Sequence, residues 1–237
     1  MLKGVGPSAA RGRDTAMLRE ILDQTAERIG SEMTNQPAVE AEIRGLIGKL
    51  YKQIGRYGQS EAMHRAALAI RRKQFGPQSA EAAESLNNLG QALMADRKLT
   101  EAETAHAEAL DIRRRLYGNV NAATATSLND LGAVYGDSGR IAQAEPIVRK
   151  ALAIRKKLFG ETSLEVADSL RNLCIVLGDK GKWSDSEMLA REVLAIRRQF
   201  LAPSIRGLYR LWLTSPGRLE RMESSRRRNH CSVKRLQ

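Results

Sequence analysis

Apolar residues in the middle of the chain recur at the spacing of an amphipathic helix. In residues 80–96 they follow one another at intervals of three and four, at Ala83, Leu86, Leu89, Gly90 and Leu93. Because an α-helix turns once in about 3.6 residues, this spacing predicts a helix with one apolar face. The stretch 101–117 has the same spacing and follows after a short turn. The two stretches together predict a helical hairpin.

The hairpin repeats every 42 residues. The segment Ala-Leu-x-Ile-Arg, with Val for the first Ala in its last copy, occupies 67–71, 109–113, 151–155 and 193–197. Ser-Leu-x-x-Leu begins at Ser85, Ser127 and Ser169, and a column of small residues contains Gly48, Gly90, Gly132 and Cys174. Small side chains let paired helices approach closely. A single hairpin cannot bury its apolar face, so we expect successive hairpins to stack.

Polar residues near the hairpin turns predict the helix ends. Thr100 with Glu103, and Ser184 with Glu187, have the spacing of a capping box at the start of a second helix. Gly139 lies between the two helices of its unit, where a helix C-cap favours glycine.

The repeat resembles the tetratricopeptide repeat (TPR) family. The residues of the third unit that carry the resemblance are Leu128, Leu131, Gly132, Tyr135, Gly139, Ile141 and Ala144. The 42-residue period, the Leu-Asn-Asn-Leu-Gly segment and Ala-Leu-x-Ile-Arg are similar to the longer subtype found in kinesin light chains. The resemblance covers residues 38–201 as four units. It implies an all-α, right-handed TPR solenoid of helix-turn-helix repeats.

Composition narrows the class of protein. Aromatic residues make up 4% of the 237 residues, which suits a core of Leu, Ile and Ala in packed helices. No apolar run approaches the ~18 residues of a membrane span, and the N-terminus lacks the apolar segment of a signal peptide. The two cysteines, Cys174 and Cys231, are too few for a disulfide framework. We therefore expect a cytoplasmic protein in a reducing compartment.

The N-terminal segment, residues 1–37, contains an amphipathic stretch at 14–34 that we expect to cap the first unit. Its apolar face comprises Met17, Leu18, Ile21, Leu22, Ala26 and Ile29. Residues 1–75 resemble the junction that precedes TPR arrays in large bacterial serine/threonine protein kinases. The chain has no kinase catalytic motif, so this resemblance implies the accessory portion of such a protein.

The C-terminal segment, residues 202–237, departs from the repeat. Nine Lys or Arg and two Glu give it a net charge of +7, against +12 for the whole chain. A fifth unit would need Ser-Leu-x-x-Leu-Gly at 211–216, and the sequence has Leu211 to Pro216 without that pattern. The segment is either a nucleic-acid or localisation patch, a disordered tail, or the non-native product of a disrupted reading frame; we expect one of the latter two.

Residues that could carry catalysis are few. His64 and His106 lie 42 residues apart at corresponding positions, which repetition explains better than chemistry. Neither has a second ligand at i+4, and no Gly-x-Ser-x-Gly elbow or phosphate loop is present. We expect no catalytic residue, no metal site and no cofactor, and predict that the chain is not an enzyme.

A stacked array forms a curved groove, which TPR geometry implies is lined by the first helix of each unit. The predicted groove residues are Lys49, Lys52, Asn87, Asn88, Gln91, Asn129, Asp130, Arg171 and Asn172. Asparagine amides can hold an extended peptide backbone, and the three cations can hold acidic groups. Alternatively, the asparagines belong to the repeat itself and support neighbouring helices.

Basic clusters recur at 71–73, 113–115, 155–157 and 197–198, near the ends of second helices. Cations there offset the helix dipole, so we expect a solvated face; a stripe that tracks phosphates is the alternative. The sequence predicts a scaffold that binds a peptide or partner domain in the groove, with acidic groups facing the groove cations, within a bacterial kinase system. The alternative function is a nucleic-acid-binding repeat protein that uses the basic rows and tail; we favour a protein partner over nucleic acid.

Overall fold

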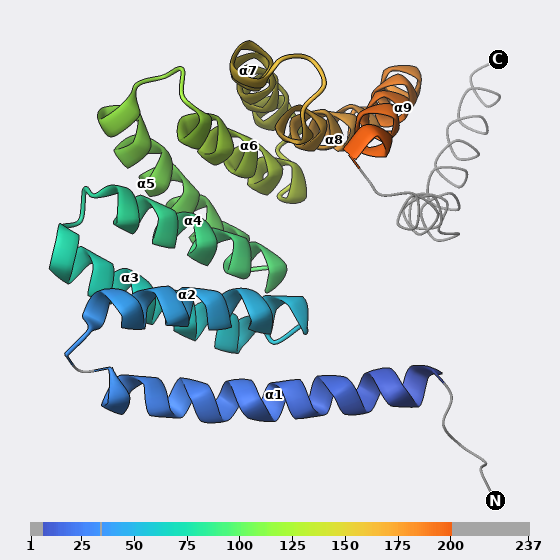
Figure 1. The fold of residues 1–237 in the computed structure, drawn as a ribbon. Helices are drawn as coiled ribbons and strands as arrows, with labels where there is room; N and C mark the ends of the chain where they lie inside the picture. The colour runs from blue at the N-terminus through green and yellow to red at the C-terminus, as the bar shows by residue number, and fades with distance from the viewer. Residues whose placement is uncertain (1–6, 34, 201–237) are drawn as a thin grey trace, which may run out of the picture.

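The computed structural model describes residues 7–33 and 35–200, and in this part of the chain helices joined by short turns are the only regular secondary structure (Figure 1). Its helices are α1 (Pro7–Glu32), α2 (Pro37–Gln53), α3 (Tyr57–Phe75), α4 (Ala80–Ala95), α5 (Leu99–Tyr117), α6 (Ala122–Asp137), α7 (Ile141–Phe159), α8 (Leu164–Asp179) and α9 (Trp183–Phe200). The predicted all-α helical repeat is confirmed. The predictions for residues 202–237 lie outside the described residues.

The helices form four stacked hairpins: α2–α3, α4–α5, α6–α7 and α8–α9. Each second helix packs against the first helix of the next hairpin. The first helices also contact one another in succession, α2 with α4, α4 with α6 and α6 with α8. The array follows a curve, with α4 and α6 toward its inner side and α5 and α7 toward its outer side (Figure 1). The first helices therefore supply the inner surface.

Glycine lets the two helices of a hairpin approach closely. A Cβ atom added at Gly48 would lie 2.7 Å from the Nε2 atom of His64, and one added at Gly90 would lie 2.5 Å from that of His106. In the third hairpin, Val148 occupies the position of these histidines, against Gly132. Both imidazoles are buried. The prediction that the small column serves close packing agrees with these contacts, and the two histidines act as core side chains.

The helix caps differ from the predicted ones. Ser79, Asn121 and Ser163 cap the first helices, because each side chain accepts a hydrogen bond from a backbone N–H in the first turn. The predicted capping boxes at Thr100 and Ser184 are wrong: both residues lie inside helices that begin one residue earlier. The connection within a hairpin is so short that the second helix begins before Thr100 can act as its cap.

α1 packs on the first hairpin through part of its predicted apolar face. Leu22 and Ile29 are buried in one cluster with Ile47 and Tyr51 of α2. The Tyr51 hydroxyl donates a hydrogen bond of 2.6 Å to the carboxylate of Asp23, and burial together with that carboxylate raises the pKa of Tyr51 above its ordinary value. The remaining apolar residues nearer the start of α1, Met17, Leu18 and Ile21, are exposed to solvent.

The turn inside each hairpin contains a residue with positive φ. Gly55, Gly139 and Gly181 occupy this column with φ of 76°, 74° and 82°, whereas Arg97 occupies it with φ of 64°. A side chain in this left-handed region costs about 1–2 kcal/mol, and glycine loses about 0.5–1 kcal/mol to its greater freedom in the unfolded chain. We expect Arg97→Gly to raise the free energy of unfolding by about 0.5–1 kcal/mol, measured by urea denaturation.

Arg97→Ala is the matched control for this prediction. It removes the same side chain, which makes only an exposed ion pair with Asp137, but it keeps a Cβ atom in the left-handed conformation. A gain in stability that Arg97→Ala reproduces in full would contradict the backbone explanation.

Buried His64 makes the stability of the fold depend on pH. Burial, with smaller contributions from Lys52, Lys49 and Arg71, lowers the pKa of His64 to about 4 from 6.5. In the unfolded chain His64 is therefore protonated near pH 6.5, whereas in the folded chain it stays neutral down to about pH 4. The free energy of unfolding falls as the pH drops between these two values. We expect this residue alone to contribute a loss of about 2 kcal/mol between pH 7 and pH 5, measured by urea denaturation.

The variant that tests this pH dependence is His64→Val, since valine already fills the same position in the third hairpin. It should remove about 2 kcal/mol of the difference between pH 7 and pH 5. Glu61→Gln is the control: its hydrogen bond from Lys98 lowers the pKa of Glu61 from its ordinary value, so that carboxylate stays ionised between pH 7 and pH 5. An unchanged pH dependence in His64→Val would overturn the explanation.

Candidate functional site

Arginines near the ends of second helices connect each hairpin to the next. The Nη1 atom of Arg113, at the end of α5, donates hydrogen bonds of 2.8 Å to the hydroxyl of Ser127 and 3.2 Å to a backbone carbonyl of α6. Arg155 repeats this arrangement with Ser169, at 2.9 Å, and a carbonyl of α8. Arg71 makes the corresponding contact with Ser85 at 3.1 Å. The last residue of Ala-Leu-x-Ile-Arg thus binds the first residue of the next Ser-Leu-x-x-Leu.

These contacts correct the expectation of a solvated basic face. Arg113 and Arg155 are buried, because their long side chains cross the junction between hairpins instead of extending into solvent. Two of their basic neighbours are paired: Arg72 binds Glu108 at 2.6 Å, and Lys156 binds Glu161. The last residue of each cluster, such as Lys73 or Lys157, is exposed as expected. Much of the basic row therefore serves packing and local ion pairing.

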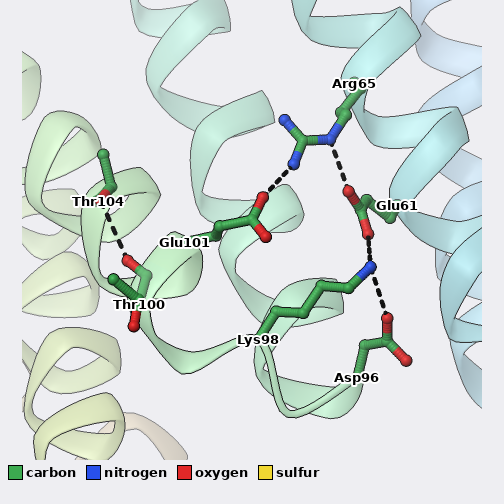
Figure 2. Close-up of polar contacts among 7 residues, drawn as sticks. All are labelled: Glu61, Arg65, Asp96, Lys98, Thr100, Glu101 and Thr104. Carbon is green, nitrogen blue, oxygen red and sulfur yellow. Dashed lines mark hydrogen bonds and ion pairs between the residues drawn. The ribbon is translucent and has the colours of Figure 1, made fainter.

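A second set of contacts between hairpins involves a glutamate that recurs near the start of each of the second helices α3, α5 and α7. Glu61 accepts hydrogen bonds from Arg65 at 2.7 Å and from Lys98, in the next hairpin, at 2.8 Å (Figure 2). Glu103 and Glu145 repeat the arrangement, with Arg140 and with Lys180. The hydrogen bonds from these cations lower the pKa values of all three carboxyl groups. The pairs are partly solvated, so each adds modestly to stability.

Three successive first helices share one chain of hydrogen bonds. The ammonium group of Lys52 in α2 donates to the amide oxygen of Gln91 in α4 at 3.0 Å. Gln91 in turn donates to the carboxylate of Asp130 in α6 at 3.3 Å, and Asn87 donates to the same carboxylate oxygen at 3.0 Å. Burial lowers the pKa of Lys52, with a smaller effect of Lys49 in the same direction and an opposing one from Asp130. Four of the predicted groove residues are thus brought together.

Three of the four predicted asparagines are buried. Asn87, Asn129 and Asn172 have only 5–6% of their surface exposed. The amide oxygen of Asn87 accepts from Arg113, and that of Asn129 accepts from Ser169 at 3.1 Å. The backbone carbonyl of Asn129 accepts from Asn172. This arrangement favours the alternative in which these three residues support neighbouring helices, and any contact of theirs with a partner stays a prediction.

The remaining predicted groove residues are accessible. Lys49 is exposed, and Asn88 and Arg171 are half-buried. The buried Nε atom of Arg171 has no hydrogen-bond partner among the described residues. Ile175, one turn further along α8, has 38% of its surface exposed. The two accessible cations therefore lie at opposite ends of the array, in the first and fourth hairpins.

The role of the junction arginines could not be predicted from helix periodicity alone. One signal was available: Arg71, Arg113 and Arg155 each precede the serine that they bind by fourteen residues. Within residues 7–33 and 35–200, no group of three or more metal-ligating side chains converges. No helix in the same ranges is both long and apolar enough to span a membrane.

Comparisons with known proteins agree with this geometry. The profile of the tetratricopeptide repeat matches residues 39–97, 81–157 and 137–199. The crystal structure of BtubC (BKLC) from P. vanneervenii is similar, with 25% sequence identity and a TM-score of 0.63, over 82% of this chain and 78% of that chain. None of the functionally characterised sequences compared with the chain matches it.

Two crystal structures of nearly identical TPR-like repeats from a predicted kinesin light chain of Podosopora anserina share the fold. They are 17% and 16% identical, with TM-scores of 0.63 and 0.61, over 80% of this chain and 90% of theirs. The matched repeats span most of the chain and coincide with the four hairpins, so the chain belongs to the tetratricopeptide repeat family.

Proposed function

We propose that this chain is a non-enzymatic scaffold that holds a peptide or a partner domain along the inner surface of its first helices. Membership of the tetratricopeptide repeat family supports a role in protein–protein interaction. The observation that carries the proposal is Arg171, a half-buried residue on the first helix α8 whose buried Nε atom has no hydrogen-bond partner among the described residues. Binding is favoured when a ligand supplies the hydrogen-bond partner that such a group lacks.

The chemistry of the accessible residues suits an acidic, extended peptide. Arg171 can hold a carboxylate through two parallel hydrogen bonds, and exposed Lys49 attracts a second acidic group at the other end of the array. Between them, Asn88 offers an amide that can both donate to and accept from a peptide backbone. Ile175 provides an apolar contact beside Arg171. A peptide with acidic residues at both ends and an apolar residue near one of them fits these positions.

The alternative nucleic-acid function gains no support from the junctions. Arg113 and Arg155 are buried between hairpins, where they cannot reach a phosphate backbone. The neighbouring cations Arg72 and Lys156 already bind carboxylates. Protein partners therefore remain the better fit to the basic rows.

The resemblance of residues 1–75 to bacterial serine/threonine kinases supports a further element of the proposal. The array would serve as the accessory region of such a kinase system in the cytoplasm, presenting a substrate or regulator. A gene neighbourhood that encodes no kinase domain would count against this context, without affecting the groove itself.

Selection from a random twelve-residue peptide library against the full chain tests the proposed function. We expect the selected peptides to be rich in Asp and Glu. The double variant Lys49→Glu with Arg171→Glu should weaken their binding at least tenfold in fluorescence anisotropy, about 1.4 kcal/mol or more, because it reverses the charge at both contacts. Peptides without acidic residues would contradict the proposal.

The double variant Lys150→Glu with Lys157→Glu is the matched control, because it changes the net charge by the same amount as the test variant. Lys150 and Lys157 are exposed cations on the second helix α7, away from the inner surface. This control should bind the selected peptides within a factor of two of the parent chain. Equal weakening by the control would show that only net charge matters and would remove the assignment to the groove.

A further inference from the structure

Each second helix buries one column of small residues against the first helix of its own hairpin. The members of this column, Ser60, Ala102, Ala144 and Ser186, have 0–5% of their surface exposed. Their contact is direct: the hydroxyl of Ser60 donates to the backbone carbonyl of Gly48 at 2.7 Å, and that of Ser186 to the carbonyl of Cys174 at 2.8 Å. Burial in this column therefore shows that a second helix has its own first helix in place.

α1 occupies the position of a second helix that precedes the first hairpin. It leads into α2 through a short connection, as α3 leads into α4. Counting back 42 residues, Ile29 corresponds to Arg71 and Ile43 to Ser85. These two isoleucines meet in the apolar cluster between α1 and α2, so an apolar contact replaces the arginine–serine hydrogen bond of the later junctions.

The face of α1 against which a preceding first helix would pack is exposed to solvent. Leu18 corresponds to Ser60 in the register and has 37% of its surface exposed, in place of 0–5%. Ile21 is half-exposed, and Thr25, which corresponds to buried Ala67, is also exposed. These residues form one stripe on α1, next to the buried stripe of Leu22 and Ile29.

The side of α2 that would face the same preceding helix is also exposed to solvent. Leu46 corresponds in the register to Asp130, the residue that contacts the first helix of the preceding hairpin through Asn87 and Gln91. Leu46 has 58% of its surface exposed. Two helices thus present large apolar side chains toward a position in the repeat pattern, before the first hairpin, that no described helix fills.

We propose that this position docks an amphipathic helix from a partner protein, with a glycine, alanine or serine in the middle of its apolar face. The small residue is required because exposed Leu18 is large where the later second helices have Ser or Ala, so the partner helix must leave the space for it. The partner helix would extend the stacking that already holds the four hairpins together, so the site continues an existing interface. It is separate from the inner surface assigned to peptide binding.

Within residues 7–33 and 35–200, a second copy of this chain offers no free first helix for the position. The described first helices, α2, α4, α6 and α8, are all packed against their own second helices. Two α1 helices cannot pair closely either, because Leu18 and Ile21 place large side chains where hairpin packing requires a small one. The occupant must therefore bring a first-helix sequence of its own.

The probe for this site is a fluorescent peptide with the sequence of residues 79–96, the first helix α4, which has Gly90 in its apolar face. A hydrocarbon staple across positions 84 and 88 keeps the peptide helical, so weak binding cannot be attributed to an unfolded ligand. We expect saturable binding to the full chain in fluorescence anisotropy. A peptide with Gly90→Leu should bind at least tenfold more weakly.

Variants of the chain locate the binding. Ile21→Asp and Leu18→Asp, at exposed positions that do not hold the fold together, should each weaken peptide binding at least tenfold. Met188→Asp is the control, because Met188 is also an exposed apolar residue but lies at the other end of the array. It should leave binding unchanged.

Three outcomes would overturn the proposal. The first is the absence of saturable binding by the stapled peptide. The second is binding that Ile21→Asp does not weaken, or that Met188→Asp weakens as much. The third is a dimer of the chain, seen in sedimentation velocity, that Ile21→Asp dissociates, because the face would then belong to a second copy. None of these outcomes bears on acidic peptides at Arg171, which test the proposed function separately.

Discussion

The structure depends on the burial of one guanidinium group at the junction between successive hairpins. Arg113 and Arg155 give up solvation to reach a serine hydroxyl and a backbone carbonyl of the next first helix. Burial lowers the pKa of both residues, and the carboxylate of Asp130 opposes that effect for both. A buried cation is tolerated only where its hydrogen bonds are made, so the contact permits one register between hairpins and excludes its neighbours.

The same carboxylate connects the junctions to the inner surface. Asp130 accepts hydrogen bonds from Gln91 and Asn87, and through Gln91 it is linked to Lys52 in the first hairpin. The inner surface therefore has a hydrogen-bonded floor, and under the proposed function its specificity would depend on the residues left accessible at the two ends, Lys49 and Arg171. A rigid floor with few adaptable contacts suits a scaffold, because little conformational entropy is lost when a ligand binds.

The sequence was sufficient for the repeat and its fold, since the columns of Leu, Ala and Gly recur over four units and each column has one packing role. It could not predict the role of a side chain whose contacts come from another unit. Asn87 and Asn129 look like groove residues on a single helix, yet their partners lie 43 and 40 residues away. Leu18 and Leu22 belong to one predicted apolar stripe, but only Leu22 meets α2, because α1 has no first helix of its own among the described residues.

Native-state hydrogen exchange of Arg155→Met tests the role of the junction arginine most directly. Methionine keeps the apolar stem but leaves the Ser169 hydroxyl and a carbonyl of α8 without their partner. The free energy of opening should then fall by about 2 kcal/mol or more for amides in α8 and α9, and stay unchanged in α2 and α3. Lys157→Met, at an exposed cation of the same helix, should change neither region. Equal protection in α8 and α9 of Arg155→Met and the parent chain would contradict the claim that buried arginines fix the register of the array.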